Sequence, residues 1–306
     1  MRIGLFLPEL GGNIEGAVQQ VVDAERDGFD STYFGQIFGA DALTIIAIAG
    51  TRTSRIEMGT SVVPTYLRHP FAMAQQAMTV QAAAAGRFTL GIGLSHAPVV
   101  ENMWGLSYEK PARHMREYLD VLLPLLREGK VAHRGEVFRV AANLQMSGVQ
   151  PPSVMIAALA PAMLKLAGER TDGTITWMTG APAIRNHIAP KLREAAAAAG
   201  RPAPRIVAGL PVCVTDDAAA ARERAARAFV IYGQLPNYRR ILDIGGVPGP
   251  ADIALVGNEA EVERQVRDLA AAGATDLVGA LFPVGDDAAA SIARSRALLQ
   301  SLIGKV

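Results

Sequence analysis

Apolar runs alternate with amphipathic segments along the whole chain. Eight runs are almost continuously apolar, as is typical of strands covered on both faces. They lie at residues 2–8, 31–36, 56–63, 88–94, 153–159, 173–178, 206–214 and 276–284. Segments of helical period lie between them, for example 14–28, 41–52, 71–85, 110–128 and 287–302. Because strands alternate with helices, the pattern predicts a parallel sheet.

The number of strand–helix units favours one kind of parallel α/β fold. Eight units in 306 residues fit a closed (β/α)8 barrel better than an open sheet. We therefore predict an α/β fold, a single (β/α)8 TIM-barrel domain over residues 1–306. The extra length falls at 95–109, in an expected hairpin at 130–150 and at 233–257. These segments are predicted to form insertion loops at the carboxyl-terminal face.

Composition and charge exclude several classes of protein. Half of the residues are hydrophobic, the net charge is +1 and no basic stripe is present, so no nucleic-acid partner is expected. No apolar run reaches the ~20 residues that span a bilayer, and the amino terminus does not read as a signal peptide. We expect no membrane association and a cytoplasmic protein. Cys213, the single cysteine, excludes an internal disulfide, and the five histidines lack metal-ligand spacing, so no metal is expected.

In such a barrel, chemistry lies on the loops that follow the carboxyl ends of the strands. The rule selects the segment GTSVVPTYLRHP at 59–70 and the strand ends Pro8-Glu9, Gly35-Gln36, Leu94-Ser95-His96, Ala158-Leu159-Ala160 and Met178-Thr179-Gly180. In the first of these, Arg68 fits a partner of either a cofactor anion or an internal carboxylate. His69 fits a residue that shapes the loop better than a catalyst.

The segment AALAPAMLK at 157–165 is a candidate phosphate site. Small residues allow a ligand to approach the backbone, and Pro161 suits the first helical position, where the neighbouring N–H groups are free. A plain tight turn from strand to helix is the alternative.

Four segments, each at a strand end, carry a family resemblance: IGLFLP, GTSVVPTYLRHP, FTLGIGLSH and AALAPAMLKLAGERTDGTITW. In them the chain resembles the bacterial luciferase-like superfamily of barrel oxidoreductases, and most closely the branch that uses the deazaflavin coenzyme F420. The resemblance covers essentially the whole chain. It implies an enzyme that transfers a hydride between the deazaflavin and a small organic substrate. The alternatives are an FMN-dependent monooxygenase and a non-catalytic flavin-binding barrel protein.

The resemblance also implies where the cofactor binds. A bulge with a cis peptide between Ser61 and Val62 would support the deazaflavin ring. Further cofactor contacts are expected from Gln36, Pro64, Leu94 and Ser95. The cofactor phosphate is expected on Ala158, Leu159, Ala160, Ala162 and Met163, where Leu159 and Ala160 replace the usual glycines.

The expected catalytic residue is His96, which matches the place of an acid/base glutamate in some deazaflavin dehydrogenases and can exchange a proton near neutral pH. A loop histidine without a chemical role is the alternative. Gln36-Ile37 stands where the sugar-phosphate dehydrogenases of the branch have Asp-His, so that activity is disfavoured. Trp177 and Thr179 are expected to line the substrate cavity, although a core position also fits Trp177. The resemblance further implies a homodimer.

Overall fold

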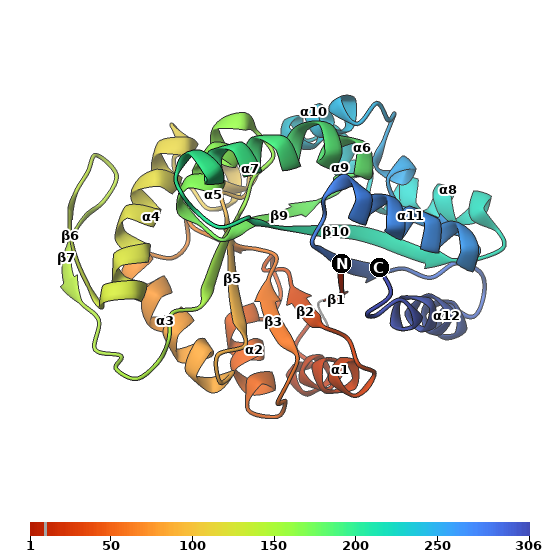
Figure 1. Ribbon diagram of the computed structural model, residues 1–306, viewed down its shortest axis with the longest axis horizontal. Coiled ribbons are helices and arrows are strands. Elements are labelled where there is room, and N and C mark those ends of the chain that lie inside the picture. Colours follow the sequence, from red (N-terminus) through yellow and green to blue (C-terminus); the bar gives the residue numbers. More distant parts are fainter. Residues whose placement is uncertain (9–10) are drawn as a thin grey trace. The chain divides into compact units, whose positions relative to one another are not determined.

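The structure is a computed structural model that describes residues 1–8 and 11–306, so the predicted strand-end position Glu9 lies outside the described residues. Eight parallel strands form its sheet in the order β10-β12-β1-β2-β3-β5-β8-β9, and β9 pairs with β10 to close the ring (Figure 1). They are β1 (Arg2–Leu7), β2 (Ser31–Phe34), β3 (Glu57–Thr60) with its continuation β4 (Val63–Pro64), β5 (Phe88–Gly93), β8 (Ser153–Ala157), β9 (Gly173–Trp177), β10 (Arg205–Val214) and β12 (Asp276–Leu281). The predicted (β/α)8 barrel is confirmed.

Helices connect these strands at the predicted places. They are α1 (Ile14–Arg26), α2 (Ala42–Gly50), α3 (Pro70–Ala83), α4 (Pro111–Glu128), α5 (Pro161–Arg170), α6 (Ala181–Ala183), α7 (Ala189–Ala198), α8 (Ala218–Ala228), α9 (Val230–Gln234), α10 (Pro236–Ile244), α11 (Glu259–Ala272) and α12 (Ala288–Ser301). Short turns of other helical type are η1 (Pro98–Met103), η2 (Ile184–Ile188) and η3 (Pro250–Asp252). The long helix α4 continues past Pro124 to its end.

The chain comprises two compact units. The first unit contains Met1–Pro8, Asp23–Tyr33 and Ala158–Val306, and the second contains Glu9–Val22 and Phe34–Ala157. The single domain over 1–306 stays a prediction.

In the second unit, the third barrel strand is interrupted. β3 pairs with the start of β5, and β4 pairs with its end through Val63–Ile92 and Pro64–Gly93. Between them the Ser61–Val62 peptide bond is cis, as the resemblance implies. The bulge expected at residues 61–62 therefore corresponds to a break in the third barrel strand.

The expected hairpin also belongs to the second unit, where β6 (Lys130–Arg134) pairs antiparallel with β7 (Arg139–Asn143) beside α4 (Figure 1). The Glu117 carboxylate of α4 accepts hydrogen bonds from three backbone N–H groups of the hairpin turn, at 2.7–3.1 Å. Burial opposes the charge of this carboxyl, but the backbone donors and His133 outweigh it and lower its pKa. The hairpin is thus anchored by one buried carboxylate.

The first unit contains the short strand β11 (Leu255–Gly257), which the sequence pattern did not predict and which pairs with the end of β10. Cys213 is fully buried here in a core cluster with Ala225, Val256 and Phe282. At the opposite end of β10, Asp276 is buried and paired with Arg205 at 2.6 Å.

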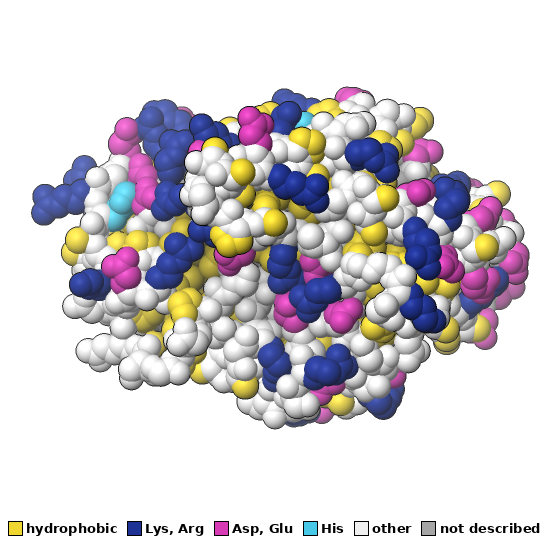
Figure 2. Space-filling view, viewed as in Figure 1, with side chains coloured by type: hydrophobic (Ala, Val, Ile, Leu, Met, Phe, Trp, Pro, Cys, Tyr) yellow, Lys and Arg dark blue, Asp and Glu magenta, His cyan; other side chains and the backbone are white. Residues whose placement is uncertain are grey.

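The surface carries charges of both signs. Figure 2 shows Lys and Arg side chains interspersed with Asp and Glu over the face that it draws. No described helix is both long and apolar enough to cross a membrane. Within residues 1–8 and 11–306, no three metal-ligating side chains gather in one place.

Candidate active site

In the second unit, the expected catalytic residue follows the end of β5. Ser95 has a left-handed backbone, with φ 59°, and its carbonyl accepts a hydrogen bond from the Tyr108 hydroxyl at 3.2 Å. Left-handed non-glycine residues cost free energy and gather at functional sites. The next residue, His96, is half-buried, and this burial lowers its pKa below the usual 6.5. Its imidazole is therefore neutral at pH 7 and can accept a proton.

The bulge at 61–62 packs tightly against β5. A β carbon added to Gly93 would lie 2.5 Å from the Val62 Cγ2 atom, so only glycine leaves room for this side chain. The Ser61 N–H donates to the Phe34 carbonyl at 2.7 Å. Pro64 is buried in β4, and Leu94 is half-buried after β5. The structure thus brings the predicted ring-support residues Ser61, Val62 and Pro64 together along the end of β5.

The Gln36 side chain binds the start of α2, a contact that the sequence did not predict. Its Oε1 atom accepts a hydrogen bond from the Ala42 N–H at 2.8 Å, at the start of α2. The amide NH2 remains as the group with which Gln36 could donate to a cofactor. The neighbouring side chain of Ile37 is 55% exposed and carries no group for proton transfer.

Arg68, which the sequence left as a partner of either a cofactor anion or an internal carboxylate, pairs with a carboxylate of the chain. Its guanidinium pairs with Asp41, which also caps α2 and accepts from the Gln76 amide at 3.2 Å. His69 shapes the loop, since its Nδ1 accepts from the Phe71 N–H at the start of α3. Arg68 and His69 therefore hold this loop in place.

A stack of rings behind this loop was missed in the sequence. Tyr66 lies between His114 and Tyr108, with ring centroids 4.0 and 5.5 Å away. The Tyr66 hydroxyl is buried without a hydrogen-bond partner among the described residues. Burial, with Tyr108 and Glu101, raises the pKa of Tyr66 to about 12. The only available sequence signal was that Tyr66 and Tyr108 fall in the segments 59–70 and 95–109.

In the first unit, the expected phosphate segment forms the turn from β8 into α5. The Ala158 N–H donates to Thr174 Oγ1 at 3.1 Å, and the Leu159 carbonyl accepts from His187 Nε2 at 2.8 Å. α5 begins at Pro161, and no described side chain caps its amino terminus. The N–H groups of Ala162 and Met163 in its first turn are thus free to bind an anion. His187, which is buried, was not predicted from the sequence.

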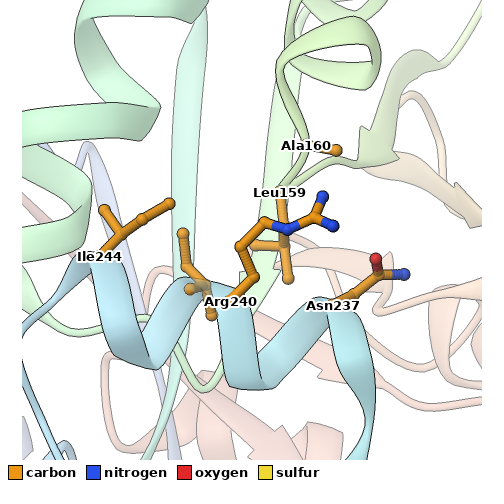
Figure 3. A pocket seen from close by; sticks show the side chains of 6 residues that line it. Leu159, Ala160, Asn237, Arg240 and Ile244 are labelled. Carbon is orange, nitrogen blue, oxygen red and sulfur yellow. The ribbon is translucent and has the colours of Figure 1, made fainter.

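A small pocket lies against this turn. It is lined by Leu159, Ala160, Asn237, Arg240, Ile241 and Ile244. Figure 3 shows the Arg240 guanidinium extending from α10 beside Leu159, with the Asn237 amide on the same side of the helix. Arg240 has no ion pair among the described residues. The site thus combines a cation, an amide and an uncapped helix terminus, which suits a phosphate. The sequence indicated only the insertion 233–257.

The expected substrate residues follow β9. Trp177 is half-buried, and its ring stacks on Phe6 with centroids 5.4 Å apart. Thr179 is buried, and its hydroxyl donates to the Trp177 carbonyl at 3.2 Å. Between them, Met178 has φ 52°, a second left-handed strand end. Substrate contact by either residue stays a prediction.

Comparisons with known proteins agree with this architecture. The fold resembles that of an F420-dependent secondary alcohol dehydrogenase in complex with an F420-acetone adduct, with a TM-score of 0.80, 20% identity and 97% of each chain covered. It also resembles the oxygenating constituent of 3,6-diketocamphane monooxygenase from Pseudomonas putida in complex with FMN, with a TM-score of 0.77, 19% identity, and 100% of this chain and 97% of that one covered. At these identities the likeness concerns the fold alone.

Sequence similarity is more informative. A putative coenzyme F420-dependent oxidoreductase of Mycobacterium tuberculosis is 31% identical over 240 residues, which are 72% of this chain and 69% of that protein. The family model described as luciferase-like monooxygenase matches residues 1–289. The chain therefore belongs to the luciferase-like monooxygenase family.

Proposed function

We propose that the chain is a coenzyme F420-dependent oxidoreductase that transfers a hydride between the deazaflavin and a small organic substrate. One observation carries the choice of cofactor. The relative that shares 31% identity over 72% of this chain is named a putative coenzyme F420-dependent oxidoreductase, whereas the FMN complex is similar at 19% identity only.

The residues of the first unit fit the phosphate of such a cofactor. The uncapped start of α5 offers two N–H groups, on Ala162 and Met163, and Arg240 offers a positive charge without another described partner. His187 holds the Leu159 carbonyl, which keeps the turn in position. The proposed phosphate contacts are therefore Ala158, Leu159, Ala160, Ala162, Met163 and, in addition, Arg240.

The residues of the second unit fit the ring and the proton transfer. When bound, the deazaflavin supplies the two-electron hydride chemistry. Ser61, Val62 and Pro64 would support its ring, and Gln36, Leu94 and Ser95 would border it. His96, neutral at pH 7, would take the hydroxyl proton when an alcohol is oxidised and return it in the reverse direction. The Tyr108 bond to the Ser95 carbonyl orients this strand end.

An FMN-dependent monooxygenase is the second candidate, favoured by the fold likeness to a protein in complex with FMN. A phosphate site at α5 would serve FMN as well as F420, because both carry this group. A flavin-binding barrel without catalysis is the third candidate.

Cofactor titration separates these candidates. Purified full-length protein should bind coenzyme F420 at micromolar concentration or below and FMN at least ~10-fold more weakly, a difference of about 1.4 kcal/mol. Bound F420 should then be reduced or oxidised when a panel of alcohols and carbonyl compounds is added. Tight FMN binding without a response to F420 would reverse the first two candidates, and cofactor binding without turnover on any substrate would favour the third.

We also propose that the protein is a cytoplasmic homodimer. The family resemblance supports the dimer, whereas most apolar side chains of α2 are already buried within the chain. Light scattering at micromolar concentration should give twice the chain mass of 32.3 kDa. A mass equal to that of one chain would refute the dimer.

A further inference from the structure

Five aromatic side chains of the first unit form a continuous cluster: Phe6, Trp177, Phe229, Tyr232 and Tyr238. Besides the stack on Phe6, Trp177 meets Phe229 and Tyr232 edge-on, with centroids 6.1 and 5.9 Å apart. Tyr238 meets Tyr232 edge-on at 5.0 Å. None of the five is fully buried. We call this group the aromatic cluster.

The aromatic cluster lies at the boundary of the core. On one side Phe229 packs against Phe282, which is 8% exposed and belongs to the buried core cluster. On the other side is α9, which has no buried residue and whose Val230 and Ile231 are 53% and 52% exposed. Partly exposed rings next to exposed aliphatic side chains are typical of a surface that a ligand covers.

Two groups of this cluster that can donate hydrogen bonds, the Trp177 indole N–H and the Tyr232 hydroxyl, are neighbours. The Trp177 Nε1 atom is buried, and no described group accepts its hydrogen in good geometry. The Tyr232 hydroxyl lies close enough to interact with the indole N–H, which lowers the pKa of the hydroxyl, but it does not meet the geometry of a full hydrogen bond. Burial raises the pKa of this hydroxyl, and the nearby indole N–H opposes the shift only in part. Tyr232 therefore stays protonated at neutral pH. A buried indole N–H without a well-placed acceptor is costly, and a ligand oxygen would satisfy it.

We propose that the aromatic cluster binds the substrate, and that this substrate is a neutral, flat, mainly apolar ring compound with one accepting oxygen. Its ring packs against the aromatic side chains, and its oxygen accepts hydrogen bonds from Trp177 Nε1 and the Tyr232 hydroxyl. The inference rests on the proposed function, because it names the substrate class of the proposed oxidoreductase.

The chemistry of the cluster separates this class from sugar phosphates. A sugar phosphate needs several polar partners and a cation. The rings that contact Trp177 in the described part of the chain are Phe6, Phe229 and Tyr232, and none of them is charged. A flat ring with a single oxygen matches both the apolar walls and the number of donors.

The indole N–H signal of Trp177 in a ¹H–¹⁵N spectrum tests the inference without turnover. The chain has two tryptophans, so Trp104→Phe assigns the signal. The probes are 1-tetralone, tetralin, which is the same ring system without oxygen, and glucose 6-phosphate. 1-Tetralone should move the Trp177 signal downfield in a saturable way. Tetralin should bind more weakly and cause no downfield shift, and glucose 6-phosphate should leave the signal in place.

A variant on α9 tests the role of the hydroxyl, with little risk to folding because this helix has no buried residue. Tyr232→Phe should weaken 1-tetralone binding by about 10-fold and change tetralin binding by less than about 2-fold. An unmoved Trp177 signal, equal 1-tetralone affinity in Tyr232→Phe, or a larger response to glucose 6-phosphate would overturn the inference.

A parallel titration with coenzyme F420 distinguishes this inference from the proposed function. If F420 does not bind while 1-tetralone moves the signal, the proposed function fails and the ligand class stands. If F420 binds while 1-tetralone leaves the Trp177 signal in place, the proposed function stands and only the ligand class fails.

Discussion

The Thr60 hydroxyl bonds to both backbone groups of Gly91. Its Oγ1 donates to the Gly91 carbonyl at 2.7 Å and accepts from the Gly91 N–H at 2.9 Å, and Thr60 is fully buried. The side chain thus replaces the strand partner that β5 lacks where β3 ends. This is why the buried strand ends in polar residues: a hydroxyl at the break satisfies backbone groups that water cannot reach.

Thr60→Val should destabilise the protein, because it keeps the shape and leaves a buried N–H and a carbonyl without partners. At about 1–3 kcal/mol for each of the two unsatisfied groups, the free energy of unfolding should fall by roughly 2–6 kcal/mol. Thr60→Ser, which retains the hydroxyl, should cost less than about 1.5 kcal/mol. Denaturant unfolding measures both, and equal stability of the two variants would show that the hydroxyl is not needed.

His96→Ala should lower turnover by at least ~10², since a positioned general base contributes about 10²–10⁴-fold, and should change F420 affinity only a few-fold. The pH profile adds a second test. Burial lowers the His96 pKa, so alcohol oxidation should be lost only as the pH falls below the usual histidine value of 6.5.

The matched control is His69→Ala, which removes a helix cap. This variant should still lose alcohol oxidation at low pH as the wild type does. If cofactor affinity collapses in His96→Ala, or if turnover barely changes, the catalytic role is wrong.

Arg240→Ala should weaken binding of coenzyme F420 by about 10-fold, because it removes a cation from the proposed phosphate site. Binding of the deazaflavin fragment that lacks the phosphate should not change. Arg264→Ala, which removes an exposed cation paired with Asp268 on α11, is the control. Equal losses for cofactor and fragment would place the effect of Arg240 elsewhere.

His114 should make stability depend on pH. Burial lowers its pKa to about 4, against 6.5 in the unfolded chain, and Glu117 offsets this only in part. The unfolded state therefore binds the proton first. The stabilisation of the folded state by neutral His114 is complete above pH 6.5 and is lost as the pH falls to about 4. The free energy of unfolding should fall by up to about 3 kcal/mol over this range, at 1.36 kcal/mol per pKa unit.

Unfolding free energies of the wild type and of His114→Gln between pH 7 and pH 4 measure this contribution. The difference between the two proteins should shrink as the pH falls. A constant difference over this range would show that His114 does not titrate in the folded protein as expected.

The barrel followed from the sequence alone because its signal is local. Each of the eight apolar runs, such as 88–94 and 206–214, carries its own periodicity, and the order of strands and helices then favours a closed parallel sheet. The strand-end rule selected the segments that hold His96, the 61–62 bulge and the turn into α5. The three-residue strand β11 was missed because so short a run has no readable period.

The partners of individual side chains were decided only by the tertiary structure. The pairing of Arg68 with Asp41, the bond from His187 to the Leu159 carbonyl and the pocket that joins Arg240 to Leu159 each connect segments at least 27 residues apart. Periodicity records which face of an element is apolar, but not which remote side chain meets it. The sequence by itself thus determined the strands and the loops that follow them, while packing between distant segments decided which groups there are free for chemistry.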